Sequence, residues 1–302
     1  MSVSAARAVL ARQSKSFALA SLLLPRRCRG DVAVLYAYCR RADDAVDEAP
    51  VGERRERVAA LFRELGSVYA GAPQTDSLLA EFQRVVRKHG IPETYPRALL
   101  EGMRSDLGPV RVADEVELVL YAHRVAGVVG LMLCHVFTLS DRRALVNADH
   151  LGIAMQLTNV CRDVLEDFRR DRVYLPATLL RTCGVRTLDP PDGDLASVRA
   201  ELAVAVRSLL LLSERYYTSG DAGLSALPFR VALAVRSARL IYAAIGAELA
   251  RRGHDALAGR AVVPLWRKLA LVAQAVATEI TARVRGRFGG PARLDAGARD
   301  AL

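Results

Sequence analysis

The stretch LTNVCRDVLEDFRRDRVYLP, residues 157–176, decides how the rest of the chain is interpreted. It carries Asp163 and Asp167 four positions apart, and on a helix of about 100° per residue they share a polar stripe. That stripe consists of Gln156, Asn159, Asp163, Asp167 and Arg170. Apolar residues cover most of the remaining helix surface. A surface helix has the opposite proportions, so we expect the stripe to face an internal cavity rather than bulk water.

Two carboxylates one helical turn apart repel each other, and burial increases the repulsion. A divalent cation reverses its sign. Carboxylate and amide oxygens suit Mg²⁺, which completes its shell with water and substrate phosphate. The alternative is a solvated acidic turn neutralised by Arg162, Arg169 and Arg170.

A second acidic pair stands far upstream, in YAYCRRADDAVDE at residues 36–48. Asp43 and Asp47 are again four apart, and Tyr36 and Arg40 share their helix face. Two helices therefore carry the same arrangement of a carboxylate pair, an arginine and apolar flanks. We predict that the two acidic stripes face each other and bind a Mg²⁺–diphosphate cluster.

The periodicity of the chain predicts an all-α protein. Apolar residues recur at intervals of three and four, and the alternation typical of strands is missing. The predicted helical segments are 31–48, 53–70, 76–89, 113–137, 141–170, 195–217, 228–252 and 261–284. No linker is long enough to split the chain, so we expect one domain over residues 1–284. The Gly- and Arg-rich end, residues 285–302, is expected to be a frayed tail.

Composition narrows the choice of partners. The 302 residues are 52% hydrophobic and carry a formal net charge of +10, which fits an anionic membrane surface or phosphorylated small molecules. Aromatics make up only 6%, with no basic tract among them, so we expect no nucleic acid partner. The five cysteines form no CxxC pair, which favours a reduced, cytoplasmic setting.

No targeting or membrane-spanning segment is expected. Arg7 and Arg12 interrupt any apolar run at the N-terminus, so a signal peptide is not predicted. The apolar run LALVAQAVATEI, which closes on Glu279, is too short to span a membrane.

Four blocks of the sequence, in this order and spacing, resemble the squalene/phytoene synthase family of head-to-head prenyl synthases. The blocks are SKSFALASLLLP (14–25), YAYCRRADDAVDE (36–48), YAHRVAGVVGLML (121–133) and GIAMQLTNVCRDVLEDFRRDRVYLP (152–176). The likeness covers roughly residues 10–285. It implies the isoprenoid synthase fold, a single large helical bundle around a central cavity.

The resemblance implies roles for particular residues. The metal ligands would be the first aspartate motif, the second motif and one amide: Asp43, Asp47, Asp163, Asp167 and Asn159. Diphosphate oxygens would be held by Arg40, Arg162, Lys15 and Ser16. The prenyl sites would be lined by Tyr36, Gln156, Tyr242 and Phe17. Tyr121 would handle the cyclopropyl intermediate. Gln13 stands where many members have His, which puts that one diphosphate contact in doubt.

Three of these residues also have a purely structural interpretation. Ser16 could cap a helix, Tyr242 could be a buried core tyrosine, and Tyr121 could serve packing beside the small residues of AGVVG.

The implied reaction is the condensation of two geranylgeranyl diphosphates through a cyclopropylcarbinyl (prephytoene) diphosphate to phytoene, with release of diphosphate. It would use Mg²⁺, with Mn²⁺ as the alternative ion, and no NADPH. The alternatives are a farnesyl diphosphate enzyme making presqualene diphosphate, squalene or dehydrosqualene, and a non-catalytic relative that binds or assembles. A terpene cyclase is disfavoured, because residues 159–167 lack an NDxxSxxxE-type motif.

The expected partners follow from an amphiphilic substrate and an oily product. We expect prenyl diphosphates as substrates and a transient, peripheral association with the inner face of the membrane. The oligomeric state stays open.

Overall fold

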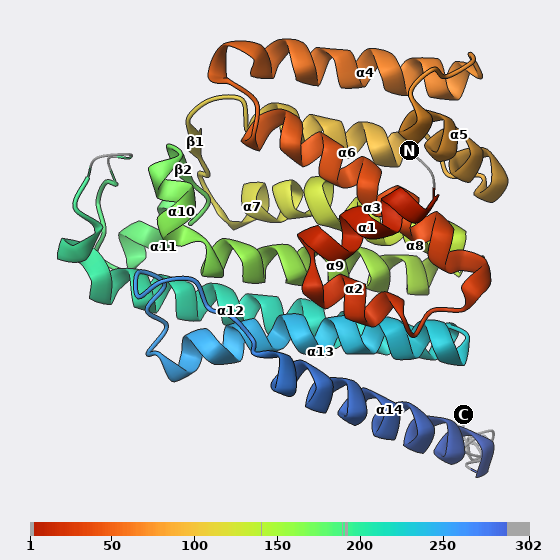
Figure 1. The fold of residues 1–302 in the computed structure, drawn as a ribbon. Helices are drawn as coiled ribbons and strands as arrows, with labels where there is room; N and C mark the ends of the chain where they lie inside the picture. The colour runs from red at the N-terminus through yellow and green to blue at the C-terminus, as the bar shows by residue number, and fades with distance from the viewer. Residues whose placement is uncertain (1–2, 140, 189, 191–192, 289–302) are drawn as a thin grey trace, which may run out of the picture.

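The computed structural model describes residues 3–139, 141–188, 190 and 193–288. Most of this is α-helix, arranged in stacked layers (Figure 1). The helices of the first half are α1 (Val3–Gln13), α2 (Lys15–Ser21), α3 (Arg26–Asp47), α4 (Arg54–Ala70), α5 (Ser77–His89), α6 (Thr94–Ser105), α7 (Glu115–Ala122) and α8 (Val128–Val136). Those of the second half are α9 (Arg142–Arg162), α10 (Val164–Arg169), α11 (Ala177–Thr182), α12 (Arg199–Gly223), α13 (Phe229–Arg251) and α14 (Leu265–Phe288).

The all-α prediction is confirmed, with short elements that the periodicity did not show. These are β1 (Val110–Arg111) and β2 (Arg172–Val173), which pair in parallel, and the one-turn helices η1 (Val51–Glu53), η3 (Leu195–Val198) and η4 (Leu224–Ala226). Two-residue strands are too short for alternation to be visible. The helices α1, α2, α6 and α11 were also not predicted.

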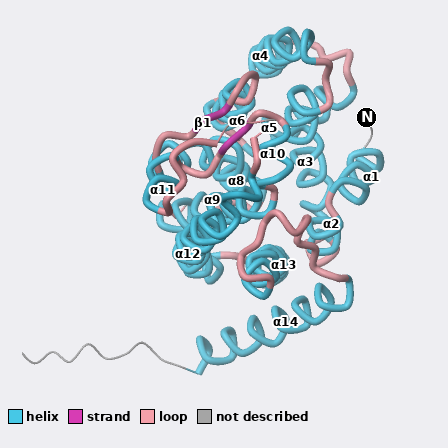
Figure 2. Tube along the Cα trace, turned by 90° about the vertical axis from the view of Figure 1, so that its left-hand side faces the viewer, coloured by secondary structure: helices cyan, strands magenta, loops and turns pink. Residues whose placement is uncertain are grey.

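Two large apolar clusters form most of the core, and α9 runs between the layers that they hold together. One cluster joins α1, α3, α4, α5, α6 and α8, and the other joins α7, α9, α11, α12 and α13. α9 packs most extensively on α12 and also meets α8 and α13. Figure 2 shows α14 outside this arrangement, beneath α13, on which it packs.

The predicted helix 113–137 is divided by a π-helical turn, η2 (His123–Gly127), and α9 passes very close to this turn. A Cβ atom on Gly152 of α9 would lie 2.4 Å from the carbonyl oxygen of Ala126 and 2.7 Å from the Cα of Gly127. Only glycine fits at that crossing.

Within the described part of the chain, one helical run, Glu115–Val136, is long and apolar enough to cross a membrane by length and composition alone. The run contains Arg124 and the ion pair between His123 and Asp149 (Nδ1 to Oδ1, 2.7 Å), and it packs against α6 and α9. Val125, Val129 and other side chains from the run line an internal cavity. The run therefore supplies part of the cavity wall, whereas Val116 and Leu120 near its start are 78% and 45% exposed.

The expected boundary at residue 284 falls within an element, because α14 continues to Phe288. The remainder of the expected tail, residues 289–302, lies outside the described residues.

Candidate active site

A cavity of about 710 Å³ lies among α2, α3, α8, α9 and α13. Its polar end is lined by Lys15, Arg40, Asp43, Asn159 and Arg162, together with Arg260 and Lys268. Its opposite end is lined by small and apolar residues, among them Ala144, Ala148, Gly223 and Leu224. A helix rises about 1.5 Å per residue, so Asn159 and Ala144 of α9 lie about 22 Å apart. The cavity therefore has a charged entrance and a long apolar part, called the bore below, which extends along α9 to Ala144.

Asp43 on α3 lines the polar end of this cavity, as predicted. No described residue donates a hydrogen bond to its carboxylate or pairs with it. Burial raises the pKa of Asp43 to about 7, Arg40 opposes the rise, and the neighbouring Asp47 adds to it. Arg40 pairs with two other acids rather than with Asp43: its Nη2 lies 2.5 Å from Asp44 Oδ1 and 2.8 Å from Glu48 Oε1.

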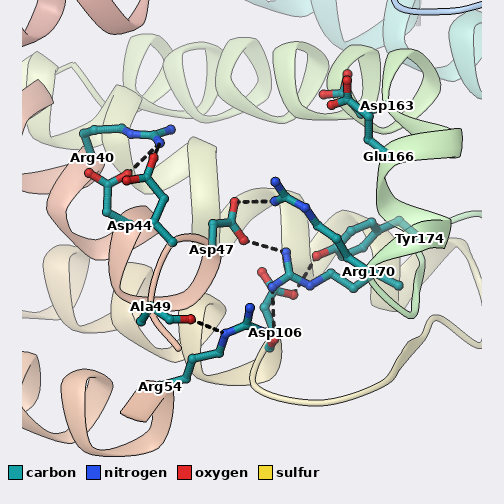
Figure 3. A network of polar contacts seen from close by, with 12 residues as sticks. Arg40, Asp44, Asp47, Ala49, Arg54, Asp106, Asp163, Glu166, Arg170 and Tyr174 are labelled. Atoms are coloured by element: carbon teal, nitrogen blue, oxygen red, sulfur yellow. Dashed lines mark hydrogen bonds and ion pairs between the residues drawn. The ribbon is translucent and has the colours of Figure 1, made fainter. Parts of the chain in front are cut away.

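Asp47, one turn further along α3, is held by two arginines from the second acidic region. Arg172 Nη1 lies 2.7 Å from Asp47 Oδ1, and Arg170 Nη1 lies 3.1 Å from Oδ2. Figure 3 shows Arg170 reaching across to Asp47, with Asp106 beside them. These ion pairs tie the end of α3 to the segment that follows α10.

Asp163 lies at the junction of α9 and α10, with φ −104° and ψ 14°, so the predicted helix 141–170 is interrupted at one residue. The backbone N–H of Asp163 donates to the carbonyl of Asn159 at 2.9 Å, and that of Asp167 donates to Asp163 at 2.8 Å. The helical hydrogen-bond pattern thus continues through the junction. Asp163 and Asp167 remain one turn apart.

The two carboxylates of this second pair have different surroundings. Asp163 accepts from Arg162 Nε at 2.7 Å and pairs with Arg260 Nε at 3.2 Å. Asp167 has no such partner among the described residues. Burial raises the pKa of Asp167 to about 8, Asp163 adds to the rise, and Arg172 opposes it.

The two acidic pairs share one electrostatic environment. Arg172 contacts Asp47 directly and opposes the rise in the pKa of Asp167. Asp106 adds to the rise in the pKa of both Asp43 and Asp167. The side chains of the first pair and the second pair are therefore near the same charges. This supports the prediction that the two helices aim their acidic stripes at a common site.

The residues present fit a hard divalent cation. Asp43 and Asp167 are unpaired carboxylates, and the amide oxygen of Asn159 is buried without a hydrogen-bond partner, since Asn159 uses its Nδ2 to donate to Gln156. No three acidic, histidine or cysteine side chains gather closely enough in the described structure to hold an ion by themselves. Such an ion would need oxygens from a bound anion or water to complete its shell.

Cationic side chains surround the same end of the cavity. The five that line it are Lys15, Arg40, Arg162, Arg260 and Lys268. Burial lowers the pKa of Lys268, and the charge of Lys15 adds to the effect. A bound polyanion would relieve the repulsion between these ammonium groups.

Aromatic rings form the wall next to these cations. Phe17 of α2 packs on Tyr242 with ring centroids 5.0 Å apart and on Tyr36 at 6.2 Å. The α2 helix is capped by Ser14, whose hydroxyl accepts from the N–H of Phe17 at 3.2 Å. Ser16 is therefore not the cap and lines the cavity.

Comparisons with known proteins agree with this geometry. A model of the family described as squalene/phytoene synthase matches residues 10–267. The chain belongs to the squalene/phytoene synthase family. It is 34% identical over 290 residues to the 15-cis-phytoene synthase of Pantoea ananas, covering 93% of each chain. It is 38% identical over 276 residues to the phytoene synthase of Cereibacter sphaeroides, covering 88% of this chain and 76% of the relative.

The fold agrees as well. The structure superposes on that of a dehydrosqualene synthase in complex with a ligand with a TM-score of 0.82 and 26% identity, covering 92% of this chain and 96% of the other. The predicted isoprenoid synthase fold is confirmed.

In this squalene/phytoene synthase family member, the structure gathers most of the predicted site residues around one cavity. Those that line it are Lys15, Ser16, Phe17, Tyr36, Arg40, Asp43, Gln156, Asn159, Arg162 and Tyr242. Gln13, the departure from the usual family pattern, lines it too. Asp47, Asp163, Asp167 and Tyr121 do not line it; the three aspartates belong to the acidic groups around its polar end. The individual roles given to all these residues stay predictions.

Tyr121 belongs to a buried network behind the acidic pairs. Its hydroxyl donates to Asp106 Oδ2 at 2.9 Å, and the Tyr174 hydroxyl donates to Asp106 Oδ1 at 2.7 Å. Burial raises the pKa of Asp106 to about 6, although Arg172 and the two hydroxyls oppose the rise. Tyr121 is thus oriented by a carboxylate that also influences both aspartate pairs.

Sequence reasoning missed five residues of this site. They are Asp106, Arg172, Tyr174, Arg260 and Lys268. Arg172 and Tyr174 lie within the stretch 157–176, so their closeness to the second acidic pair could have been predicted. Asp106, Arg260 and Lys268 stand alone in the sequence, and no spacing marks them.

Proposed function

We propose that this protein condenses two geranylgeranyl diphosphates head to head, through a cyclopropylcarbinyl diphosphate, into phytoene, with release of diphosphate. The observation that carries the proposal is the shape of the cavity: a charged entrance joined to an apolar bore that follows α9 for about 22 Å. Phytoene synthase is also the name of the similar proteins from Pantoea and Cereibacter.

The length of the bore favours the longer substrate. Carbon–carbon bonds of about 1.5 Å in a zigzag advance an extended isoprene unit by about 5 Å, so four units need about 20 Å and three need about 15 Å. Ala144, at the far end, lies about 22 Å from Asn159, and Ala148 about 16 Å from it. A four-unit chain therefore fits before the bore ends.

The cationic residues would bind the diphosphate groups and stabilise their departure. Lys15, Arg40, Arg162, Arg260 and Lys268 converge on the polar end, where they can neutralise charge that grows on the leaving oxygens. Mg²⁺, held by Asp43, Asp167 and the Asn159 amide with their neighbours Asp47 and Asp163, would supply further charge neutralisation. Mn²⁺ is the alternative ion.

The apolar bore would protect the allylic cation that remains after the carbon–oxygen bond breaks. Its lining beyond the aromatic rings is mostly aliphatic, with Ser21, Cys39 and Cys134 as polar exceptions. Burial raises the pKa of both thiols, and the Ser21 hydroxyl donates to the carbonyl of Ala18 at 2.7 Å, so none of the three is an activated nucleophile. The double bond of the second prenyl chain is then the available nucleophile. The closing proton loss needs no reductant, so we propose no NADPH requirement.

The deciding experiment is incubation of the purified protein with Mg²⁺ and either geranylgeranyl or farnesyl diphosphate, followed by extraction and mass analysis of the hydrocarbon. We expect phytoene from the former without NADPH, and no product in the presence of a chelator. A product from farnesyl diphosphate alone would support the alternative, a dehydrosqualene- or squalene-type enzyme. Turnover of neither substrate would support a non-catalytic relative.

Asp43→Asn and Asp167→Asn test the metal assignment. Each removes one unpaired carboxylate, so we expect turnover to fall by about a thousandfold or more, while the unfolding temperature without metal is retained. Glu56→Gln is the matched control, because Glu56 is an exposed acid on α4 whose ion pair within the described residues is with Arg63. Near-normal rates in either aspartate variant would refute the assignment.

A further inference from the structure

The last described helix, α14, exposes an apolar face to solvent. Leu265, Trp266, Leu269, Ile280 and Val284 are 67%, 71%, 51%, 50% and 49% exposed. At about 100° per residue these five side chains fall within an arc of about 100° on one side of the helix. The charged positions that share the arc, Arg283 and Arg287, are both basic.

Toward the bundle, α14 makes ion pairs and hydrogen bonds as well as apolar contacts, such as that of Leu271 with the core. Glu279 is buried at 3% exposure and accepts from Arg236 Nε of α13 at 2.6 Å. Arg283 donates to the carbonyl of Leu227 at 2.6 Å, and Arg267 lies 3.6 Å from Glu248. An ordinary surface helix turns most of its large apolar side chains inward, whereas α14 leaves these five exposed and packs on the bundle partly through charged groups.

The exposed face is continuous with the cavity. Val262, three residues before α14, is 62% exposed and also lines the cavity. Lys268, on the second turn of α14, lines the cavity near Lys15. An apolar chain leaving the cavity past Val262 would meet Leu265 and Trp266 next.

The charge of this region favours an anionic occupant. Residues 256–288 contain six basic residues and one acid, Glu279, which Arg236 already neutralises. A second copy of the chain docked through the same face would bring these like charges together, which is unfavourable. Anionic lipid headgroups would instead complement them, while the aliphatic side chains and the indole enter the acyl boundary.

We propose that the α14 face, defined by Leu265, Trp266, Leu269, Ile280 and Val284, docks on the surface of an anionic bilayer beside the cavity entrance. Docking would let an amphiphilic substrate and an oily product pass between bilayer and cavity without crossing water. This use of the surface rests on the proposed function, whereas the docking itself does not. It agrees with the peripheral membrane association expected from the sequence.

The chain offers an internal probe for the test. Trp266 is its single tryptophan, so intrinsic fluorescence reports directly on the proposed surface. The protein, without substrate or metal, is titrated with vesicles of phosphatidylcholine alone or mixed with phosphatidylglycerol. We expect a blue shift, and quenching by brominated acyl chains, only with the anionic vesicles. No shift, or an equal shift with both vesicles, overturns the proposal.

Matched variants separate docking from catalysis. Leu269→Glu/Ile280→Glu should lower the fraction bound to anionic vesicles by about tenfold or more, while turnover of substrate dispersed in detergent stays unchanged. Val204→Glu/Leu211→Glu is the control, because these α12 side chains are also exposed, at 54% and 61%, but belong to another face. Wild-type binding by the α14 variant overturns the proposal.

A shift of Trp266 fluorescence without lipid that grows with protein concentration, together with a dimer in sedimentation, would assign the face to a second copy instead. Because vesicle binding is measured without substrate, an inactive protein that still docks would refute the proposed function and leave the docking surface standing.

Discussion

At the scale of single residues, each aspartate pair contains one carboxylate that is ion-paired with arginine and one that has no ion-pair partner among the described residues. Asp47 is held by Arg170 and Arg172, and Asp163 by Arg162, whereas neither Asp43 nor Asp167 has an ionic partner in the described structure. The free members also have the raised pKa values. Unpaired carboxylates near a common site are costly unless a cation joins them, which is the physical basis of the metal proposal.

Arg172 is expected to contribute more to the stability of the fold than Arg170, although both contact Asp47. The Arg172 side chain is 6% exposed and the Arg170 side chain 52%. Arg172→Gln leaves buried carboxylates without their partner, so we expect the free energy of unfolding to fall by about 3 kcal/mol or more. Arg170→Gln should cost less than about 1 kcal/mol. Urea denaturation of both variants checks this, and equal losses would contradict it.

At the scale of elements, close crossings and buried ion pairs fix how the helices meet. The crossing of α9 over η2 depends on Gly152, and the contact of α3 with α5 depends on Asp31. Both features connect segments that are distant in sequence.

Gly152→Ala should lower the free energy of unfolding by about 1–3 kcal/mol, because the new methyl group overlaps the backbone at Ala126. Gly66→Ala is the control: Gly66 is exposed within α4 and a Cβ there meets nothing within 4 Å. That change should stabilise the protein by about 0.5–1 kcal/mol. Opposite signs in thermal or urea unfolding are the expected result; two losses of the same size would argue against the close crossing.

Asp31 ties α3 to α5 through a buried carboxylate that accepts from Arg84 at 2.8 Å, Lys88 at 2.7 Å and His89 at 2.8 Å. Burial alone would raise its pKa, but these three hydrogen bonds outweigh burial and lower the pKa of Asp31 from 3.8 to about 2. A lowered folded-state pKa stabilises the protein above the unfolded value, and the stabilisation is lost as the pH falls through the folded value.

Asp31→Asn should therefore lower the free energy of unfolding by about 2 kcal/mol at neutral pH, and the difference from wild type should shrink as the pH falls from about 4 to about 2. Glu81→Gln, which removes another partner of Arg84, serves as the control and should have little effect. Denaturant titrations across this pH range measure both variants. A difference that is independent of pH would contradict the assignment.

At the scale of the whole molecule, the helices enclose a cavity, and we propose that the length of its apolar part selects the length of the prenyl substrate. Ala148 lies on α9 between the charged entrance and the end of the bore at Ala144. The sequence alone could not locate this end, because it is formed jointly by α9 and the end of α12.

Ala148→Phe should shorten the bore to about the length of three isoprene units. We expect turnover of geranylgeranyl diphosphate to fall by about tenfold or more, with farnesyl diphosphate turnover retained or gained. Val146→Phe is the control on the same helix, since Val146 is 53% exposed. Mass analysis of the products decides, and an unchanged substrate preference would show that the bore does not end where we place it.

The sequence by itself determined most of the long helices and the two acidic pairs. Both signals are local: apolar spacing of three and four defines a helix, and carboxylates four apart share its face whatever the rest of the chain does. The stretch 157–176 and its counterpart at 36–48 were sufficient to predict a buried, cation-binding site between two helices.

Only the tertiary structure decided what surrounds those acids and which way the outer helix faces. Asp106, Arg260 and Lys268 join the site from elements that are far apart in sequence, at positions without a recognisable spacing. The break at Asp163 and the π-helical turn at η2 arise within helices that the sequence predicted as continuous. Periodicity predicted a helix over 261–284, but it cannot tell which face meets the bundle, because that depends on the partners Arg236 and Leu227 that packing brings to it.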